Sequence, residues 1–257
     1  MGVYFIEKGA SVRSSEVVYD RANSVISQVK PGEINWNEIF KDAKWFHFTG
    51  ITPALGDNVA KVTEEACKAA KEMNVTISCD INYRSKLWDP KQAGKVMRNL
   101  MQYVDVCITN EEHAALLFGI KSPAKNTNDD GLDFNEECSK LVAKQLADEF
   151  GFKLTAVTFR RTVSASHNKW WAMLYDNRDF YLSKKYDLQI VDRVGSGDAF
   201  AAGLIYGMVN NKGAKYAAEF GAAACALKHT IEGDINYVRA SEVEEFMNAS
   251  TLGAVKR

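Results

Sequence analysis

Residues 192–201 read Asp-Arg-Val-Gly-Ser-Gly-Asp-Ala-Phe-Ala, and this stretch is the most informative in the chain. It follows a strand-like run at 188–191 and leads into a helix of small residues, which we expect to open at Ala199. Gly195 and Gly197 let the backbone turn its N–H groups toward one point, and the start of a helix adds partial positive charge. The stretch therefore predicts an anion site suited to phosphate.

Asp198 is the unusual member of this stretch, because a bound phosphate repels a neighbouring carboxylate. Its presence is explained if it takes a proton from a hydroxyl group that attacks the phosphate. The alternative is an ordinary loop in which Asp198 caps the following helix. Two other phosphate motifs are absent: there is no G-x-x-x-x-G-K-[ST], and G-x-G-x-x-G would need glycine where Phe200 stands.

The composition limits the class of protein. The 257 residues are 46% hydrophobic and 25% charged, which is typical of a globular chain with one large core. A net charge of −1 without a basic block argues against a nucleic-acid partner. Five cysteines without C-x-x-C or zinc spacing indicate free buried thiols in a reducing compartment. We find no membrane span and no signal peptide, so we expect a cytoplasmic protein.

The order of the predicted elements indicates an α/β fold. β-like runs at 3–6 and 16–19 predict a hairpin, and from about residue 37 helices alternate with buried strands. This alternation predicts a parallel sheet covered by helices on both faces. The predicted helices are 37–43, 57–73, 90–103, 111–118, 136–150, 199–209, 214–228 and 241–248. The predicted strands are 45–49, 75–80, 104–109 and 154–159, with a second hairpin at 170–175 and 180–183 and a surface loop at 121–135.

Polar residues follow the strand predicted at 75–80, and ligands bind at this end of parallel strands. Asp80, Asn82 and Arg84 alternate, so an extended segment puts their side chains on one side. Arg84 can make a forked contact to a carboxylate or phosphate, although an arginine is most often a plain surface residue. Arg160 and Arg161 follow another predicted strand in the same way.

Acidic residues follow the strand predicted at 104–109. Asn110, Glu111 and Glu112 read most simply as a helix cap with acids in the first turn. The functional alternative is that one of these acids holds Mg²⁺ through water, because this ion keeps most of its waters.

The stretch 192–199 closely resembles the C-terminal signature of the ribokinase-like (PfkB) carbohydrate kinases. Five further segments resemble the 2-keto-3-deoxygluconate kinase subgroup of that family, namely 3–9, 18–22, 80–84, 109–112 and 183–187. The resemblance implies a three-layer α/β/α sandwich with a mostly parallel sheet and a small β lid. We expect residues 1–34 to form the lid hairpin and its connection, and 35–257 to form the nucleotide- and substrate-binding domain.

The resemblance also implies an activity, the ATP-dependent phosphorylation of a sugar acid, 2-keto-3-deoxy-D-gluconate, to its 6-phosphate. Asp198 is implied as the base, and the N–H groups of Gly195, Ser196 and Gly197 as the anion hole. The implied substrate contacts are Tyr4, Tyr19, Arg21, Asn82, Arg84 and Asp198. The implied nucleotide contacts are Asn82, Thr158, Arg160, Gly195, Gly197 and Ala222, with Glu112 as a water-mediated Mg²⁺ ligand. Two arginines with tyrosine hydroxyls suit a carboxylate better than a neutral hexose. Ala222 lies among small residues that also favour close helix packing.

Two departures from the family pattern keep alternatives open. His113 stands where many relatives have an acid, so Glu111 or Glu112 must serve for magnesium. Relatives also begin with further βα units that carry a Gly-Gly substrate motif, which residues 1–50 do not contain. We therefore expect a sheet that lacks strands and a substrate pocket that lacks one wall. The alternatives are another kinase of the family, such as a ribokinase or fructokinase, and a non-catalytic nucleotide-binding remnant. A homo-oligomer that pairs through the lid is also expected.

Overall fold

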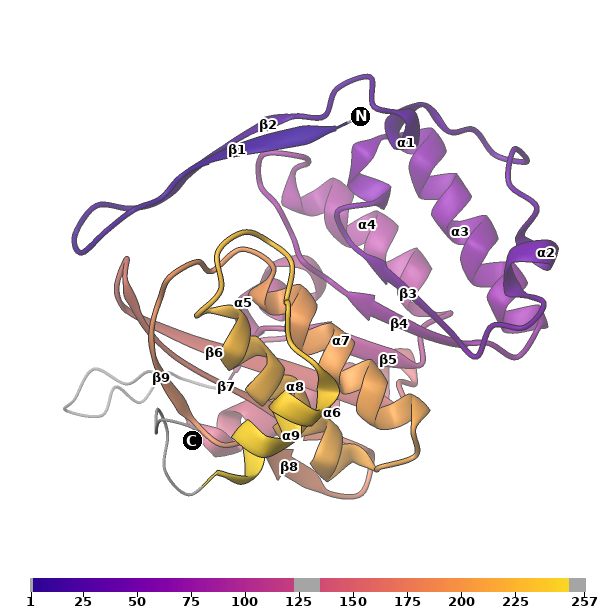
Figure 1. Ribbon diagram of the computed structural model, residues 1–257. Coiled ribbons are helices and arrows are strands. Elements are labelled where there is room, and N and C mark those ends of the chain that lie inside the picture. The colour runs from indigo at the N-terminus through magenta and orange to yellow at the C-terminus, as the bar shows by residue number, and fades with distance from the viewer. Residues whose placement is uncertain (1, 123–134, 250–257) are drawn as a thin grey trace. The chain divides into compact units, whose positions relative to one another are not determined.

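The computed structural model describes residues 2–122 and 135–249 (Figure 1). The chain forms two compact units. The first unit contains Met1–Phe5, Val17–Thr158 and Leu174–Phe180, and the second contains Ile6–Glu16, Phe159–Met173 and Tyr181–Arg257. The sequence-based boundary at residue 34 stays a prediction. The predicted surface loop at 121–135 lies almost wholly outside the described residues.

The first unit is built on parallel strands, as predicted. Strands β3 (Trp45–Thr49), β4 (Thr76–Asp80) and β5 (Val106–Thr109) pair side by side, and β5 pairs with the start of β6 (Leu154–Ser164). Hydrogen-bonded neighbours give the strand order β3-β4-β5-β6-β7-β8, with β9 also beside β7. The carboxyl ends of β3, β4, β5 and β6 therefore point the same way, which is the arrangement that places ligands beyond them.

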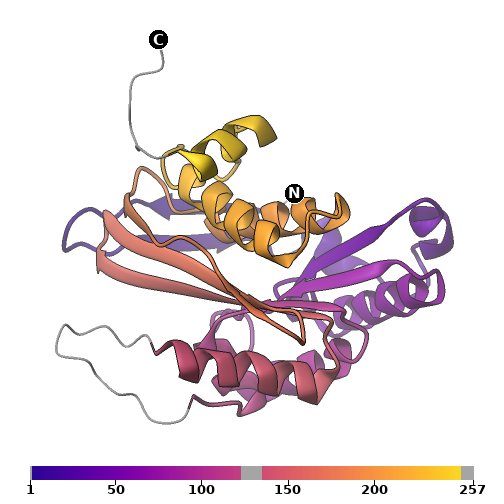
Figure 2. The same cartoon turned by 90° about the horizontal axis from the view of Figure 1, so that it is seen from below.

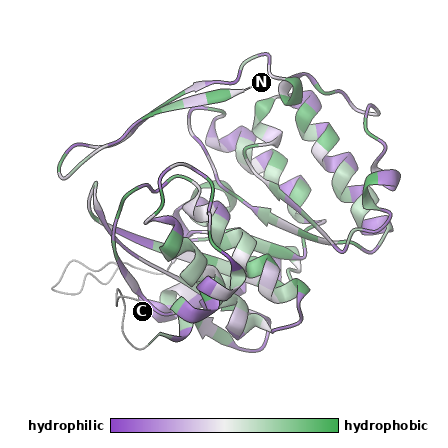
Figure 3. Ribbon diagram, in the orientation of Figure 1, coloured by the Kyte–Doolittle hydropathy of each residue, from purple (hydrophilic) through white to green (hydrophobic). Residues whose placement is uncertain are grey.

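Helices α3 (Asp57–Glu72), α4 (Pro90–Met101), α5 (Glu111–Phe118) and α6 (Glu136–Phe150) lie close to their predicted ranges. Hydrophobic and polar residues are interspersed along these helices, as the colours of Figure 3 show. Their apolar side chains pack into one core. The core includes Ile77, Cys79, Met97, Leu100 and Leu146. The shorter α2 (Trp36–Phe40) ends before the predicted residue 43. The sequence did not predict α1 (Val25–Gln28) or the 3-10 helix η1 (Pro53–Leu55).

The predicted N-terminal hairpin is confirmed. Strands β1 (Val3–Glu7) and β2 (Glu16–Asp20) form a separate two-stranded sheet. The turn between them is closed by a bridge between Ala10 and Arg13. A Cβ at Gly9 would lie 2.2 Å from the Arg13 carbonyl oxygen, so only glycine lets the chain pass this closely.

The second hairpin, predicted at 170–175 and 180–183, is part of a longer antiparallel region in the structure. Strand β6 does not end near residue 159 but continues to Ser164, and after a two-residue turn the chain returns as β7 (His167–Tyr175). Strands β8 (Phe180–Leu182) and β9 (Tyr186–Gln189) follow, and β9 pairs antiparallel with β7. The end of β6 was missed because its side chains are mostly polar and exposed, so no hydrophobic alternation marks it.

The helices of the second unit are α7 (Ser196–Val209), α8 (Ala214–Lys228) and α9 (Ala240–Asn248). Helix α7 packs on β7, since the ring centroids of Trp170 and Phe200 lie 5.1 Å apart. Figure 2 shows α7, in orange, lying over the strands of the second unit. Helices α7 and α8 approach closely, because a Cβ on Gly203 would lie 2.7 Å from the Cα of Gly221. Among the described residues no helix is both long and apolar enough to cross a membrane.

Candidate active site

The predicted anion site lies at the start of helix α7 in the second unit. The helix begins at Ser196, with Gly195 as its N-cap. The predicted start at Ala199 is wrong because Gly195 adopts a φ of 77°, which completes the turn and lets the next residue take helical geometry. Gly197 and Asp198 therefore belong to the first helical turn, where backbone N–H groups have no partner within the helix.

The N–H groups of this first turn are suitable donors for an anion. The Ser196 N–H donates to the Arg193 carbonyl, with an N···O distance of 3.2 Å. In the part of the chain that the structure describes, the N–H groups of Gly197 and Asp198 have no protein acceptor, and both residues are exposed. Two unpaired donors at the positive end of a helix favour a bound anion, and this geometry fits a phosphate group of ATP.

Gly195 sits in a position that admits no side chain. Its φ of 77° lies in the left-handed region, and a Cβ there would lie 2.1 Å from the Asp234 carbonyl oxygen. The phosphate turn, residues 192–198, thus rests directly on the backbone of the segment that follows α8.

Asp198 presents an exposed carboxylate in the same helical turn as the unpaired N–H groups. The capping alternative is wrong, because Gly195 occupies the N-cap position and no side chain caps α7. An acid in the first turn is stabilised by the helix dipole. The arrangement therefore places a solvent-accessible proton acceptor beside an anion site.

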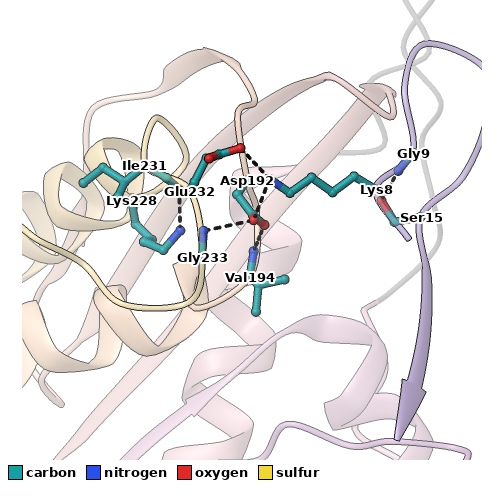
Figure 4. A network of polar contacts seen from close by, with 9 residues as sticks. All are labelled: Lys8, Gly9, Ser15, Asp192, Val194, Lys228, Ile231, Glu232 and Gly233. Atoms are coloured by element: carbon teal, nitrogen blue, oxygen red, sulfur yellow. Dashed lines mark hydrogen bonds and ion pairs between the residues drawn. The ribbon is translucent and has the colours of Figure 1, made fainter. Parts of the chain in front are cut away.

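Asp192 holds the phosphate turn in place (Figure 4). Its side chain is 5% exposed and accepts hydrogen bonds from the N–H of Val194 at 3.1 Å and of Gly233 at 3.2 Å. Lys8 forms an ion pair with it at 3.3 Å and another with Glu232 at 3.0 Å. Burial by itself would raise the pKa of Asp192, but the two N–H groups and Lys8 bring it below its ordinary value.

Lys8, Gly233 and Lys228 were not singled out from the sequence. Lys8 is in the N-terminal hairpin and the other two follow or end α8, so only the tertiary fold brings them to Asp192. One signal was available for Lys228. It is a lone cation that ends a run of small and apolar residues at 221–227, where a solvated residue is unexpected.

Two further predicted nucleotide residues of the second unit, Arg160 and Ala222, lie in different settings. Arg160 is exposed, at the point where β6 turns polar, and Ala222 is fully buried in α8. The packing interpretation of Ala222 is therefore confirmed, and its contact with adenine stays a prediction. His229 is also buried, and this burial lowers its pKa, with a further lowering from the charge of Arg160.

The remaining predicted site residues belong to the first unit. Asn82 follows β4 with a φ of 35°, and its N–H donates to Asp80 Oδ1 at 3.1 Å. The prediction of an extended segment with three side chains on one side is wrong, because this side-chain turn breaks the alternation. A non-glycine residue at positive φ is strained, which is common at binding sites. Arg84 is exposed. The Thr158 hydroxyl donates to the Thr109 carbonyl at 3.2 Å.

Three predicted substrate residues meet on the hairpin and its connection. The rings of Tyr4 and Tyr19 have centroids 6.3 Å apart, and the Arg21 guanidinium lies 4.1 Å from the centroid of the Tyr19 ring. This cation–π contact keeps the positive charge of Arg21 against the Tyr19 ring, which itself lies beside the Tyr4 ring. The cluster has the groups that a carboxylate ligand needs.

The acids that follow β5 lie in the first turn of helix α5. The Asn110 side chain accepts from the His113 N–H at 2.8 Å and caps α5, which confirms the capping interpretation. Glu111 accepts a hydrogen bond from the Ser139 hydroxyl, and Glu112 is exposed. Among the described residues no group of three or more His, Cys, Asp or Glu side chains could hold a metal. A single exposed carboxylate still fits Mg²⁺ that is held mainly by waters and phosphates.

Comparison with known proteins gives the family. The family model for pfkB family carbohydrate kinases matches residues 1–240. A 2-dehydro-3-deoxygalactonokinase of Haloferax volcanii is 30% identical over 98% of this chain and 72% of its own length. A 2-dehydro-3-deoxygluconokinase of Thermoproteus tenax is 25% identical over 96% of this chain and 68% of its own length.

A solved structure agrees with this match and with the fold. The 2-dehydro-3-deoxygluconokinase of Thermotoga maritima superposes with a TM-score of 0.91 at 42% identity, covering 97% of this chain and 73% of that one. The ribokinase-like fold predicted from the sequence is thereby confirmed. The chain belongs to the pfkB family of carbohydrate kinases.

Proposed function

We propose that this protein transfers the γ-phosphate of ATP to the 6-hydroxyl group of 2-keto-3-deoxy-D-gluconate. The observation that carries the proposal is the exposed Asp198 carboxylate in the same helical turn as the unpaired N–H groups of Gly197 and Asp198. A general base and an anion site are the two parts that phosphoryl transfer to an alcohol requires. The names of the Thermotoga and Thermoproteus relatives support the choice of sugar acid.

In this mechanism the Asp198 carboxylate accepts the proton of the sugar hydroxyl as that oxygen attacks the γ-phosphorus. The bond from the γ-phosphorus to the β–γ bridging oxygen breaks, and ADP leaves. The N–H groups at the start of α7 stabilise the negative charge on the transferred phosphoryl group. Glu112 would hold Mg²⁺ through water, and the ion would neutralise charge on the nucleotide phosphates. Arg160 and Thr158 are proposed to contact those phosphates.

Recognition of the sugar acid is assigned to the first unit. Arg84 and Arg21 are proposed to bind its carboxylate, and the hydroxyls of Tyr4 and Tyr19 to bind its oxygen atoms. The position of Arg21 against the Tyr19 ring supports this, because it reduces the freedom lost when the ligand binds. Asn82 is proposed to lie between sugar and phosphate, and its positive φ supports a binding role.

The proposal is tested by measuring ADP release with ATP, Mg²⁺ and each of four substrates. We expect turnover with 2-keto-3-deoxygluconate and much slower turnover with ribose or fructose. The fourth substrate is 2-keto-3-deoxygalactonate, which differs in configuration at one carbon. Efficient turnover of ribose or fructose would point to another kinase of the family. Binding of ATP without any turnover would support the non-catalytic alternative.

The galactonate epimer is a second candidate substrate. It is favoured by the Haloferax relative, which is 30% identical and is a 2-dehydro-3-deoxygalactonokinase. Both epimers carry the same carboxylate, so the arginines do not distinguish them. The ratio of their kcat/KM values decides between the two candidates.

The carboxylate assignment is tested by replacing Arg84 with methionine. Hydrogen bonds to charged groups are worth about 1.5–3 kcal/mol, so Arg84→Met should raise the KM for the sugar acid by about 10-fold or more. Arg178→Met is the matched control, because Arg178 is also exposed in the first unit but lies in the turn before β8. An unchanged KM for the sugar acid in Arg84→Met would remove the assignment.

A further inference from the structure

The phosphate turn is supported by the segment that follows helix α8, residues 229–234, which we call the bracing segment. Gly233 donates its N–H to Asp192 Oδ2 at 3.2 Å, and the Asp234 carbonyl lies against Gly195. The His229 carbonyl accepts the N–H of Asp192 at 3.2 Å. The position of the phosphate turn therefore depends on how firmly the bracing segment is held.

The Lys228 side chain contacts the backbone of the bracing segment (Figure 4). It ends α8, and its side chain has no exposed surface. Its Nζ donates to the Ile231 carbonyl at 2.9 Å, and the Ile231 N–H donates back to the Lys228 carbonyl at 3.1 Å. Burying an ammonium group is costly unless negative groups compensate it. A lysine kept here in the charged form must therefore interact with such groups.

The compensating charges are those of Asp192 and Asp234. Burial lowers the pKa of Lys228 below its ordinary value, and these two carboxylates act in the opposite direction. The positive charge of Lys8 lowers the pKa of Lys228 further, since two cations repel each other. The charge of the ammonium is thus compensated by Asp192, which belongs to the phosphate turn, and by Asp234, whose backbone carbonyl lies against Gly195.

We propose that Lys228 is a positioning residue of the phosphate turn. Its ammonium ties the Ile231 carbonyl to the end of α8 and so fixes the bracing segment, on which Asp192 and Gly195 rest. Without this tie the bracing segment shifts, and the N–H groups at the start of α7 no longer converge on one anion. The inference rests on the proposed function, because it takes the phosphate turn to bind ATP.

The test compares the affinities of ATP and adenosine for the full chain and for Lys228→Met, with isothermal titration calorimetry for ATP and competition for adenosine. We expect Lys228→Met to weaken ATP binding by about 10-fold or more. The affinity for adenosine should change by less than about twofold, because adenosine has no phosphate for the turn to hold. Equal weakening of both ligands, or unchanged ATP affinity, overturns the proposal.

Lys215→Met is the matched control, because Lys215 is exposed on the same helix and its loss changes the net charge equally. We expect it to bind ATP like the wild type, and equal weakening in both variants overturns the proposal. If Lys228→Met does not fold, Lys228→Gln replaces it, since glutamine keeps an N–H donor without the charge. If neither variant folds, Lys228 supports the whole unit rather than the turn, and the proposal is overturned. A wild-type chain that does not bind ATP contradicts the proposed function instead.

Discussion

Gly195 is glycine for two independent reasons, its left-handed φ of 77° and the approach of the Asp234 carbonyl to 2.1 Å from a Cβ position. The left-handed conformation alone costs an L-residue about 1–2 kcal/mol, and the clash adds to this. We expect Gly195→Ala to weaken ATP binding by about 10-fold or more and to lower the melting temperature. Gly197→Ala is the matched control for the melting temperature, because a Cβ there meets no protein atom within 4 Å. Equal losses of melting temperature in both variants, measured by calorimetry, would contradict the steric argument.

Asp198 is the residue on which the proposed chemistry depends. Asparagine has the same shape but does not accept a proton, so Asp198→Asn should lower kcat by about 100-fold or more. ATP affinity should remain close to that of the wild type, since the backbone donors are unchanged. Asp57→Asn is the control, because Asp57 is an exposed first-turn acid of another helix, α3. The assay is ADP release with the sugar acid, and a near-normal kcat for Asp198→Asn would exclude Asp198 as the base.

At the scale of elements, Asp105 joins three parts of the first unit. Its buried carboxylate accepts the Ile77 N–H at 3.0 Å, and Lys71 of α3 and Lys153 before β6 each lie 3.1 Å away. Its backbone also bonds to both neighbouring strands, since its N–H donates to the Ile77 carbonyl and its carbonyl accepts the Leu154 N–H. Asp105 therefore fixes β4, β5 and β6 at their amino ends, opposite the end where ligands bind.

The stabilisation by Asp105 depends on pH. Burial would raise the pKa of Asp105, but the Ile77 N–H and the two lysines bring it below its ordinary value of 3.8. A lowered folded-state pKa means that the stabilisation is present above about pH 4 and is lost as the pH falls through the folded-state value. Asp105→Asn should lower the free energy of unfolding at pH 7 by about 1–3 kcal/mol. The main loss is that the Ile77 N–H then donates to a neutral amide oxygen instead of a carboxylate, because both lysines are exposed and add little.

Urea unfolding of the wild type and Asp105→Asn from pH 7 to pH 3 measures this difference. We expect the difference to shrink toward the acid end, where the wild-type carboxyl is also neutral. A difference that stays constant over this range would show that charge does not contribute. Asp148→Asn is a suitable control, because Asp148 is an exposed acid on α6 of the same unit.

At the scale of the molecule, strands β6 and β7 each run through both compact units. Neither unit can keep these strands intact alone, so we expect one cooperative unfolding transition. The cysteines report on it. Cys67, Cys79 and Cys107 are buried in the first unit and Cys225 in the second, while Cys138 is partly exposed. Burial raises the pKa of Cys67 to about 12, so little reactive thiolate forms there in the folded protein.

Alkylation at increasing urea, followed by mass spectrometry, tests this expectation. Cys138 should react first, in the folded protein, and the four buried thiols should react together at one denaturant midpoint. Separate midpoints for Cys225 and Cys79 would show that the units unfold independently. Dithiothreitol should leave the melting temperature unchanged, because all five cysteines are free thiols.

The pattern of residue types along the sequence predicted the regular helices and strands. It failed at two turns where a residue adopts a positive φ. Helix α5 has its predicted range because Asn110 caps it and Gly119 ends it in the left-handed conformation. Hydrophobic runs marked β3 and β4 equally well. Helix α7 begins at Ser196, three residues before the predicted start at Ala199. The error arose because residue types do not show which φ a glycine adopts. The turn at Asn82 was missed for the same reason, since an extended and a turned segment share one composition.

The sequence by itself determined the α/β class and the glycine-rich turn with its acid at 192–199, because both follow from the order of polar, apolar and glycine residues along the chain. The other residues of the proposed site were implied by the resemblance to the kinase family. Only the tertiary structure decided what holds that signature in place. Lys8 and Gly233 lie far from Asp192 in the sequence, and they contact it because the hairpin and the segment after α8 return to one point, where Lys228 also lies. A buried carboxylate needs such partners, and residue order alone does not show which distant groups provide them.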